Sequence, residues 1–186
     1  MRRLIPLIFL SLFLLPRDYD PALAKKVEDR LLRIERESKR FLRWLYSKKE
    51  DFSQQEVNSY INYALEKRQG DVIFRGVRVV LQEGAVILSG GLILKKPIPG
   101  FEIGARGWKI IPIRMKFSIV QAGDKYRTKL QESFLGRTKI NPKLFSTLLP
   151  VLKDATGFNF DQERWKPLPF GLKRVEVHRG KVTVYY

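Results

Sequence analysis

Apolar residues recur at helical spacing in the first stretch of charged sequence, residues 25–50. The segment KKVEDRLLRIERESKRFLRWLYSKKE contains no Gly or Pro. Its apolar stripe consists of Val27, Leu31, Ile34, Phe41 and Leu45. Its basic outer face consists of Arg30, Arg33, Arg36, Lys39, Arg40 and Arg43. The pattern predicts an amphipathic helix over residues 25–50, which either covers one side of a sheet or lies on a membrane surface.

Two further helices are predicted by their start signals. Ser53 and Glu56 form a capping box, and Gly70 is a suitable end for the helix that follows. The apolar face of that helix consists of Val57, Ile61, Ala64 and Leu65. Asn141 and Pro142 begin a third helix, which Pro150 would kink or end. Its apolar stripe consists of Leu144, Phe145, Leu148, Leu149 and Leu152.

The hydrophobic period changes to two after Val72, which indicates strands. Residues 72–94 read as two strands joined by a turn at Glu83 and Gly84, with apolar side chains on both faces. This turn predicts that Leu81 faces Val86, that Val79 faces Leu88 and that Val80 faces Ile87. Residues 172–186 predict a second hairpin with its turn at Arg179 and Gly180. Its predicted pairs are Val177 with Val182, Val175 with Val184, and Glu176 with Thr183.

Two more strands are predicted at about residues 109–121 and 126–135. The first has Ile111, Ile113, Met115, Phe117 and Ile119 on one face, and Arg114, Lys116 and Ser118 on the other. Pro112 removes a backbone donor, so this strand should start at a sheet edge or a bulge. The order of elements predicts a single α+β domain over residues 51–186, preceded by the helix of residues 25–50. We expect a strongly twisted antiparallel sheet of about six strands that wraps around amphipathic helices.

The first 24 residues have the pattern of a signal peptide. Arg2 and Arg3 precede an apolar run over residues 4–15, and Ala22 and Ala24 form an A-x-A cleavage site. The run is shorter than the about 20 residues needed to span a bilayer. We therefore expect cleavage after Ala24 and export to the periplasm or cell envelope, although retention of the segment as an anchor stays open. The sequence contains no Cys, which excludes disulfides and thiolate chemistry.

The net charge of the chain indicates which classes of binding partner are expected. The chain carries 36 Lys and Arg against 19 Asp and Glu, a formal net charge of +17. Such a surface attracts polyanions. For an exported protein these are anionic lipid head groups and acidic polysaccharides rather than nucleic acid, which we do not expect as a partner.

Catalytic and cofactor motifs are not recognised in the sequence. His178 is the only histidine, and the carboxylates are scattered without the spacing of a catalytic pair or a metal site. The segment GFEIGARG lacks the phosphate-binding glycine patterns of nucleotide-binding proteins. We expect a protein that is not an enzyme and that binds no cofactor or metal.

Two segments resemble the LmeA-like phospholipid-binding proteins of bacterial envelopes, which are related in shape to the tubular lipid-binding superfamily. The first is FSQQEVNSYINYAL followed by FRGVRVVLQEGAVILSGGLIL, and the second is PLPFGLKRVEVHRGKVTVYY. The second segment carries the similarity in Leu168, Pro169, Gly171, Leu172 and Gly180. The resemblance implies non-enzymatic binding or carriage of phospholipid.

The surplus of apolar surface suggests where a lipid would bind. We expect acyl chains between the sheet and the third helix, in contact with Ile111, Ile113, Met115, Phe117, Leu144, Leu148 and Leu149. The Gly- and Pro-interrupted segment KKPIPGFEIGARGW would form a membrane-touching mouth through Phe101 and Trp108. Lys95, Lys96, Arg106 and Lys109 would contact head groups or the membrane. The alternative is an exported structural or acidic-polysaccharide-binding domain with a dry core.

Overall fold

A computed structural model describes residues 19–39, 47–67, 72–94, 110–141, 145 and 164–186 of the chain. The described helices are α2 (Pro21–Ser38), α3 (Gln54–Glu66) and the short 3-10 helix η1 (Pro169–Gly171). The first strands are β1 (Lys49–Ser53), β2 (Val72–Gln82), β3 (Ala85–Leu94), β4 (Ile110–Ala122) and β5 (Lys125–Leu135). The remaining strands are β6 (Thr138–Lys139), β7 (Lys166–Pro167), β8 (Arg174–His178) and β9 (Lys181–Tyr185). The protein is a mixed α+β fold of one domain, as the sequence predicts.

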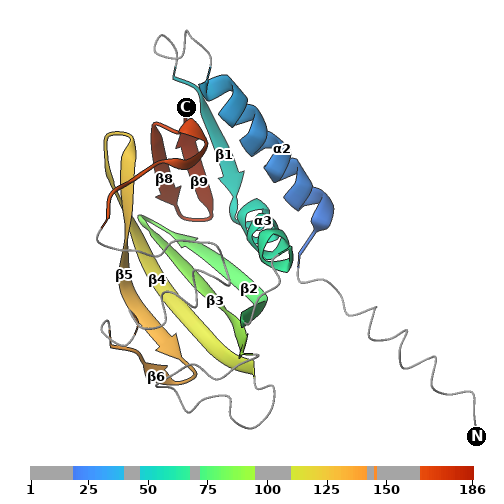
Figure 1. The fold of residues 1–186 in the computed structure, drawn as a ribbon, viewed down its shortest axis with the longest axis vertical. Helices are drawn as coiled ribbons and strands as arrows, with labels where there is room; N and C mark the ends of the chain where they lie inside the picture. The colour runs from blue at the N-terminus through green and yellow to red at the C-terminus, as the bar shows by residue number, and fades with distance from the viewer. Residues whose placement is uncertain (1–18, 40–46, 68–71, 95–109, 142–144, 146–163) are drawn as a thin grey trace, which may run out of the picture.

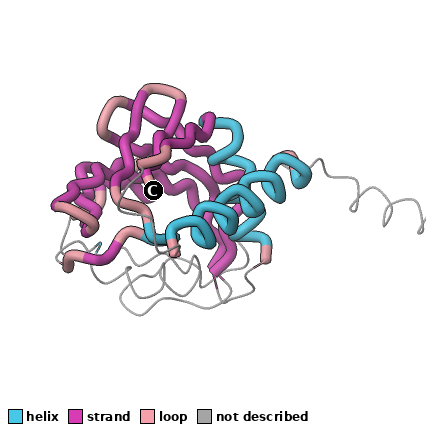
Figure 2. The backbone as a smooth tube through the Cα atoms, turned by 90° about the horizontal axis from the view of Figure 1, so that it is seen from above, coloured by secondary structure: helices cyan, strands magenta, loops and turns pink. Residues whose placement is uncertain are grey.

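The strands form two antiparallel sheets. The six-stranded sheet has the order β2-β3-β4-β5-β6, with β7 pairing onto β5, and the three-stranded sheet has the order β1-β9-β8. Figure 1 shows the closing hairpin of β8 and β9 beside the ends of the long strands rather than among them. Helices α2 and α3 pack against each other on one side of the molecule (Figure 2).

Both predicted hairpins are confirmed in position and register. Leu81 pairs with Val86 across the first turn, and Val177 pairs with Val182 across the second. The glycine in each turn has positive φ, 65° at Gly84 and 78° at Gly180, a conformation that residues with a Cβ rarely adopt. The alternation in β4 is also confirmed, because Ile113, Met115 and Phe117 are buried while Arg114 is exposed.

The prediction of one helix over residues 25–50 is wrong. Helix α2 ends at Ser38, residues 40–46 lie outside the described residues, and residues 49–53 form strand β1. The hydroxyl of Ser38 donates to the carbonyl oxygens of Glu35 and Phe170, so the polar residue that interrupts the apolar stripe marks the end of the helix. Strand β1 forms because β9 offers it a free edge, a long-range pairing that helical periodicity cannot reveal.

The helix also begins earlier than predicted, inside the predicted signal peptide. The Asp20 carboxylate accepts hydrogen bonds from the backbone N–H groups of Ala22 and Leu23, at 2.9 and 3.3 Å, and so caps α2. Ala24 is fully buried. Cleavage after Ala24 remains a prediction, and it would remove this cap from the mature helix.

Helix α3 confirms the predicted capping box and packs Val57 and Ile61 against the core, but its most buried residues, Ser59 and Asn62, are polar. Asn62 donates to the carbonyl oxygen of Val77 at 2.6 Å and accepts from its N–H at 3.2 Å. Asn58 makes the same pair of bonds to Val79, and Gln54 accepts from the N–H of Leu81. These three amides, four residues apart on the helix, satisfy the free edge of β2 as a neighbouring strand would.

A similar amide contact joins the two sheets. The side chain of Gln121, near the end of β4, donates to the carbonyl oxygen of Val175 and accepts from its N–H. The turn glycines add two backbone bonds, from Gly84 N to Val177 O and from Gly180 N to Leu81 O. The closing hairpin is therefore fastened to the ends of the long strands at defined positions.

Candidate functional site

The inner face of the large sheet, which faces α3, is apolar along the rows that cross β2, β3 and β4. Across the strands, Val79 pairs with Leu88 and Leu88 with Met115, which places the three side chains on this face. Leu81, Val86 and Phe117 form the next row. Val79, Met115 and Phe117 are almost completely buried. The packing produces a dry surface that extends across β2, β3 and β4.

A cavity of about 270 Å³ lies between this inner face and helix α3. Helix α3 contributes Ile61 and Leu65 to its wall, and β5 contributes Tyr126 and Thr128. The sheet residues that complete the wall are Phe74, Val77, Val86, Leu88, Ser89, Gly90, Ile113, Met115, Phe117 and Ile119. The lining is almost entirely aliphatic and aromatic, so the space suits an apolar ligand better than a polar one.

Three of the predicted acyl-chain contacts, Ile113, Met115 and Phe117, line this cavity. Ile111 packs against the neighbouring cluster, which also contains Phe145, a residue with 1% of its surface exposed. Phe145 belongs to the predicted third helix. The other predicted lipid and membrane contacts lie outside the described residues: Phe101, Trp108, Leu144, Leu148, Leu149, Lys95, Lys96, Arg106 and Lys109.

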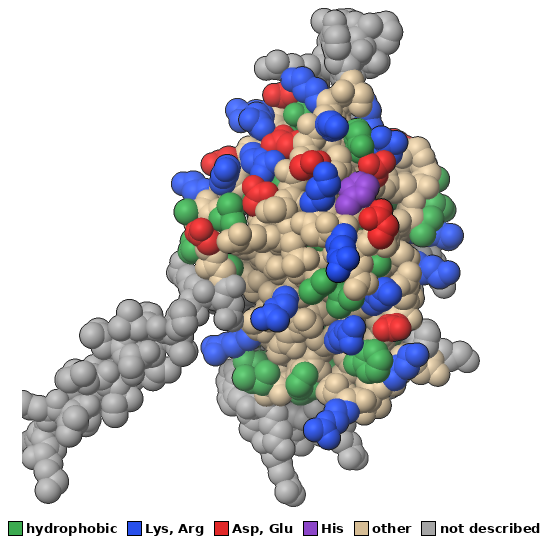
Figure 3. All heavy atoms as spheres, turned by 180° about the vertical axis from the view of Figure 1, so that it is seen from behind, with side chains coloured by type: hydrophobic (Ala, Val, Ile, Leu, Met, Phe, Trp, Pro, Cys, Tyr) green, Lys and Arg blue, Asp and Glu red, His purple; other side chains and the backbone are tan. Residues whose placement is uncertain are grey.

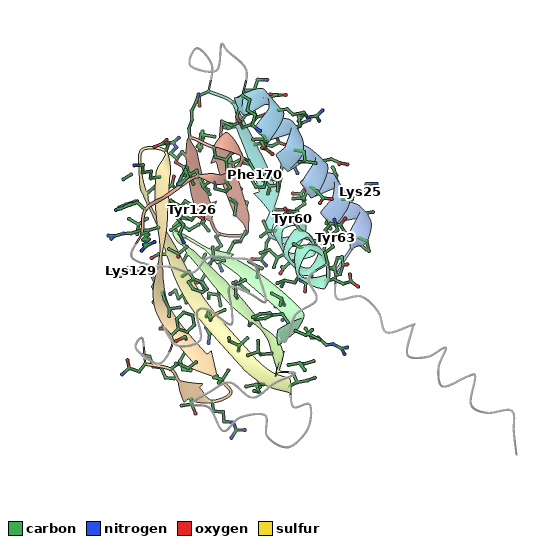
Figure 4. The ribbon with its side chains drawn as sticks, viewed as in Figure 1. Lys25, Tyr60, Tyr63, Tyr126, Lys129 and Phe170 are labelled. Carbon is green, nitrogen blue, oxygen red and sulfur yellow. The ribbon has the colours of Figure 1, made fainter. Side chains whose placement is uncertain are left out.

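Sequence reasoning missed the parts of the wall that come from α3, β2, β3 and β5. Val86 and Leu88 belong to the hairpin whose two faces are both apolar. Apolar side chains on both faces were the feature of the sequence that could have identified these wall residues. The alternation of Tyr126, Thr128 and Leu130 against Arg127 and Lys129 was a second signal. In Figure 4, Tyr126 points inward from β5 and Lys129 points away from the molecule. Burial raises the pKa of the Tyr126 hydroxyl.

One wall residue carries an unsatisfied polar atom. The Oγ1 atom of Thr128 is buried and has no hydrogen-bond partner in the part of the chain that the structure describes. A buried hydroxyl of this kind costs about 1–3 kcal/mol relative to one that is paired. Among the described residues, this hydroxyl is the one buried side-chain polar atom without a hydrogen-bond partner, and it lies in a mostly apolar wall.

Titratable groups gather instead around the small sheet. Asp51 accepts from the Thr183 hydroxyl at 2.6 Å and from Lys181 at 3.0 Å, and these bonds lower the pKa of its carboxyl group. Glu176 accepts from the Tyr185 hydroxyl at 2.8 Å, and this bond is the main cause that lowers its pKa. Both carboxylates are thus stabilised in their charged form as partners of hydroxyl groups, an arrangement that holds strands together.

The charged residues of α2 have structural partners. Arg30 lies over the ring of Phe52, with 4.1 Å from Cζ to the ring centroid, and contacts Glu50 and Glu56 at 2.5 and 2.6 Å. Arg33 contacts Glu50 at 2.9 Å, and this pairing raises the pKa of the Arg33 guanidinium. Part of the predicted basic outer face therefore points at β1 and α3 and fastens the helix to them.

Neither metal chemistry nor a membrane-spanning helix is indicated by the described residues. Among them, no three His, Asp or Glu side chains lie close enough together to hold a metal ion. None of the helices formed by residues 19–39, 47–67 and 164–186 combines the length and apolar character needed to cross a bilayer.

Comparisons of the chain with protein-family models, with curated proteins and with solved structures found no match. The resemblance to LmeA-like proteins stays a prediction from the two sequence segments. The functional argument below rests on the geometry of the inner face and on the charge.

Proposed function

We propose that this protein is an exported, non-enzymatic lipid-binding protein of the periplasm or cell envelope. It holds or carries phospholipid acyl chains against the inner face of the large sheet, and it docks on anionic membrane. The observation that carries the proposal is the cavity of about 270 Å³ with an almost wholly apolar wall. The formal charge of +17 supports an anionic surface as the partner.

The volume of the cavity limits the size of the ligand that fits without a change in the structure. An apolar cavity of about 150 Å³ stays dry and binds a molecule the size of benzene, so this cavity of 270 Å³ suits roughly a dozen carbon atoms. That is part of one acyl chain rather than a whole phospholipid. A lipid with two full chains needs the sheet and its cover to separate further.

Residues from α3, together with Phe145, cover the inner face of the large sheet. Ile61 and Leu65 of α3 line the cavity at one end, and Phe145 packs into the sheet cluster of Leu92, Ile113 and Met115. These contacts support a strongly twisted sheet that wraps around amphipathic helices, because α3 and the helical residue Phe145 both pack on the inner face. An acyl chain would lie between these helices and the sheet.

The binding energy would come from burial of methylene groups. Each methylene transferred from water contributes about 0.8 kcal/mol, which is roughly a fourfold change in affinity. We expect affinity for single-chain lipids to rise by about this factor per methylene until the cavity is full. Since the wall offers few polar groups, the head group would contribute little inside the cavity.

The test is native mass spectrometry and lipid extraction of the purified mature protein, followed by a transfer assay between liposomes. The cavity-filling variant Val86→Phe should lose bound lipid and transfer. Val120→Phe is the matched control, since Val120 lies on β4 facing away from the cavity and is also half-buried. It should retain bound lipid, the property that reports on the cavity alone.

A protein that contains no lipid, transfers none and behaves identically in both variants would refute the proposal. Retained binding to an acidic polysaccharide in that case would favour the exported structural or polysaccharide-binding domain with a dry core. The substitution Met115→Glu would then simply unfold the protein, because Met115 is 2% exposed in the centre of the sheet.

A further inference from the structure

We propose that the outer face of the large sheet, the face opposite the cavity, is the surface that docks on an anionic bilayer. The choice of a membrane as partner rests on the proposed function, whereas the choice of surface rests on the arrangement described below. The outer face is defined by the side chains of β2–β5 that alternate with the cavity wall.

Cations follow one another across the strands of this face. Arg78 pairs with Ser89 and Ser89 with Arg114, which places both guanidinium groups on the outer face. Lys116 lies in the next row beside Ile87, and Lys129 lies beyond it opposite Ser118. Arg75, Arg78, Arg114 and Lys129 are exposed. The register of the sheet thus gathers cations from β2, β4 and β5 into one basic surface.

These cations differ from Arg30 and Arg33 of α2, which are neutralised by carboxylates. Among the described residues, Arg75, Arg78, Arg114, Lys116 and Lys129 have no carboxylate within ion-pair distance, whereas Arg30 and Arg33 contact Glu50. Glu132, opposite Lys116, is the one carboxylate on the described strand positions of this face. Unpaired cations on a rigid sheet are suited to anions supplied by a partner.

One end of the outer face is apolar, with Ile93 buried at 6% exposed surface and Ile110 exposed at its margin. Ile73 pairs with Ile93 and Ile93 with Ile110, which forms a row of three isoleucines across β2, β3 and β4. Ile110 has 60% of its surface exposed. It leans over Gly91, because a Cβ atom at that glycine would lie only 2.5 Å from Ile110 Cγ2. The absence of a side chain at Gly91 therefore leaves room for the exposed Ile110 beside the basic surface.

Figure 3 shows the same gradient on the molecular surface. Lys and Arg side chains predominate in its lower half, hydrophobic side chains lie toward the lower edge, and most Asp and Glu side chains lie in the upper half. An apolar rim with cations directly behind it matches a bilayer interface, where aliphatic groups enter the head-group region and cations contact phosphate. A soluble acidic polymer offers no apolar partner for the exposed side chain of Ile110.

The expected loss of membrane binding can be estimated from the number of cations that are removed. Each Lys or Arg near an anionic membrane changes the partition coefficient roughly fivefold. Replacing Arg78, Arg114 and Lys129 by Gln should therefore weaken binding roughly a hundredfold. The effect should fall with added salt, since exposed charges are screened over about 10 Å at 0.1 M.

The experiment is vesicle sedimentation with the mature protein, on phosphatidylcholine vesicles with and without phosphatidylglycerol. The triple variant Arg78→Gln, Arg114→Gln, Lys129→Gln is compared with the control Lys25→Gln, Lys26→Gln, Arg36→Gln on α2, whose residues are also exposed. Both variants lower the formal net charge by three. Lys25 and Lys129 lie on opposite sides of the molecule (Figure 4).

We expect the sheet variant alone to lose binding to vesicles that contain phosphatidylglycerol. The single variant Ile110→Ser should weaken the binding that remains at high salt, where the contribution of charge is reduced. Thermal unfolding of each variant shows whether the fold is retained, and only folded variants enter the comparison. Arg78, Arg114 and Lys129 are exposed and form no ion pair with any described residue, so folding should be unaffected.

Equal losses in both triple variants would overturn the proposal, because they would indicate attraction by net charge rather than by this surface. Loss of binding to alginate with unchanged binding to vesicles would also overturn it and favour an acidic polysaccharide. Native mass spectrometry separates the two proposals: lipid retained by the sheet variant supports the cavity whatever the vesicle result. If the wild-type protein bound vesicles but contained no lipid, the docking proposal would be supported and the lipid-binding cavity would not.

Discussion

The unsatisfied hydroxyl of Thr128 gives the sharpest prediction about the cavity wall. Replacing Thr128 by Val keeps the β-branched shape that suits a strand and removes only the polar atom. Since Oγ1 is buried without a partner among the described residues, its removal should stabilise the folded protein. The cost of an unpaired buried hydroxyl, about 1–3 kcal/mol, sets the upper range of the gain in free energy of unfolding.

The same substitution at Thr183 is the matched control, for which we expect the opposite change in the free energy of unfolding. Thr183 is 4% exposed, and its hydroxyl donates to the Asp51 carboxylate at 2.6 Å. Thr183→Val removes this hydrogen bond and leaves the carboxylate without its hydroxyl partner. We expect it to destabilise the protein, although the change in side-chain size is identical.

The assay is urea unfolding of lipid-free protein, supported by thermal unfolding. For a chain of this length, 1 kcal/mol corresponds to a shift of about 2–4 °C in Tm. An increased midpoint for Thr128→Val with a decreased midpoint for Thr183→Val supports the assignment. A loss of stability in Thr128→Val would refute the reasoning, because it would mean that the hydroxyl has a partner in solution.

Two further predictions concern the sheet edges. Asn62→Leu should destabilise the protein by roughly 2–4 kcal/mol in urea unfolding, because both backbone groups of Val77 lose their partner, while Gln55→Leu on the exposed side of α3 should have little effect. Similar results for both would contradict the role of the amides. The pKa of Asp51 is lowered in the folded protein, so its contribution to stability is complete above the unfolded pKa of about 4 and is lost as the pH falls through the folded value. Asp51→Asn should therefore weaken the fall in Tm between about pH 5 and pH 2, and an unchanged profile would argue against the assignment.

The local features were predictable because they depend on neighbouring residues. Gly84 and Gly180 fix the two hairpin turns, and each turn fixes the register of its strands. Ser53 and Glu56 fix the start of α3 for the same reason. The alternation in β4 identified Ile113, Met115 and Phe117 as a buried face before any partner for that face was known.

Features that depend on distant segments were not predictable. The helix expected to continue beyond Ser38 gives way to β1, because β9 supplies backbone partners from the other end of the chain. Two asparagines of α3 point toward the protein because the edge of β2 lies beside them, and without that edge Asn58 and Asn62 look like surface residues. The cavity itself depends on how α3 lies over the sheet.

The sequence by itself determined the class of the fold, the two hairpins, the apolar face of β4 and the strong positive charge. These follow from periodicity, turn chemistry and composition, each of which acts over a few residues or over the whole chain without regard to topology. Only the tertiary structure decided which cations are neutralised on α2 and which remain unpaired on the outer face. It also decided which apolar faces meet and where a space remains between them, because burial and pairing depend on contacts between segments far apart in the chain.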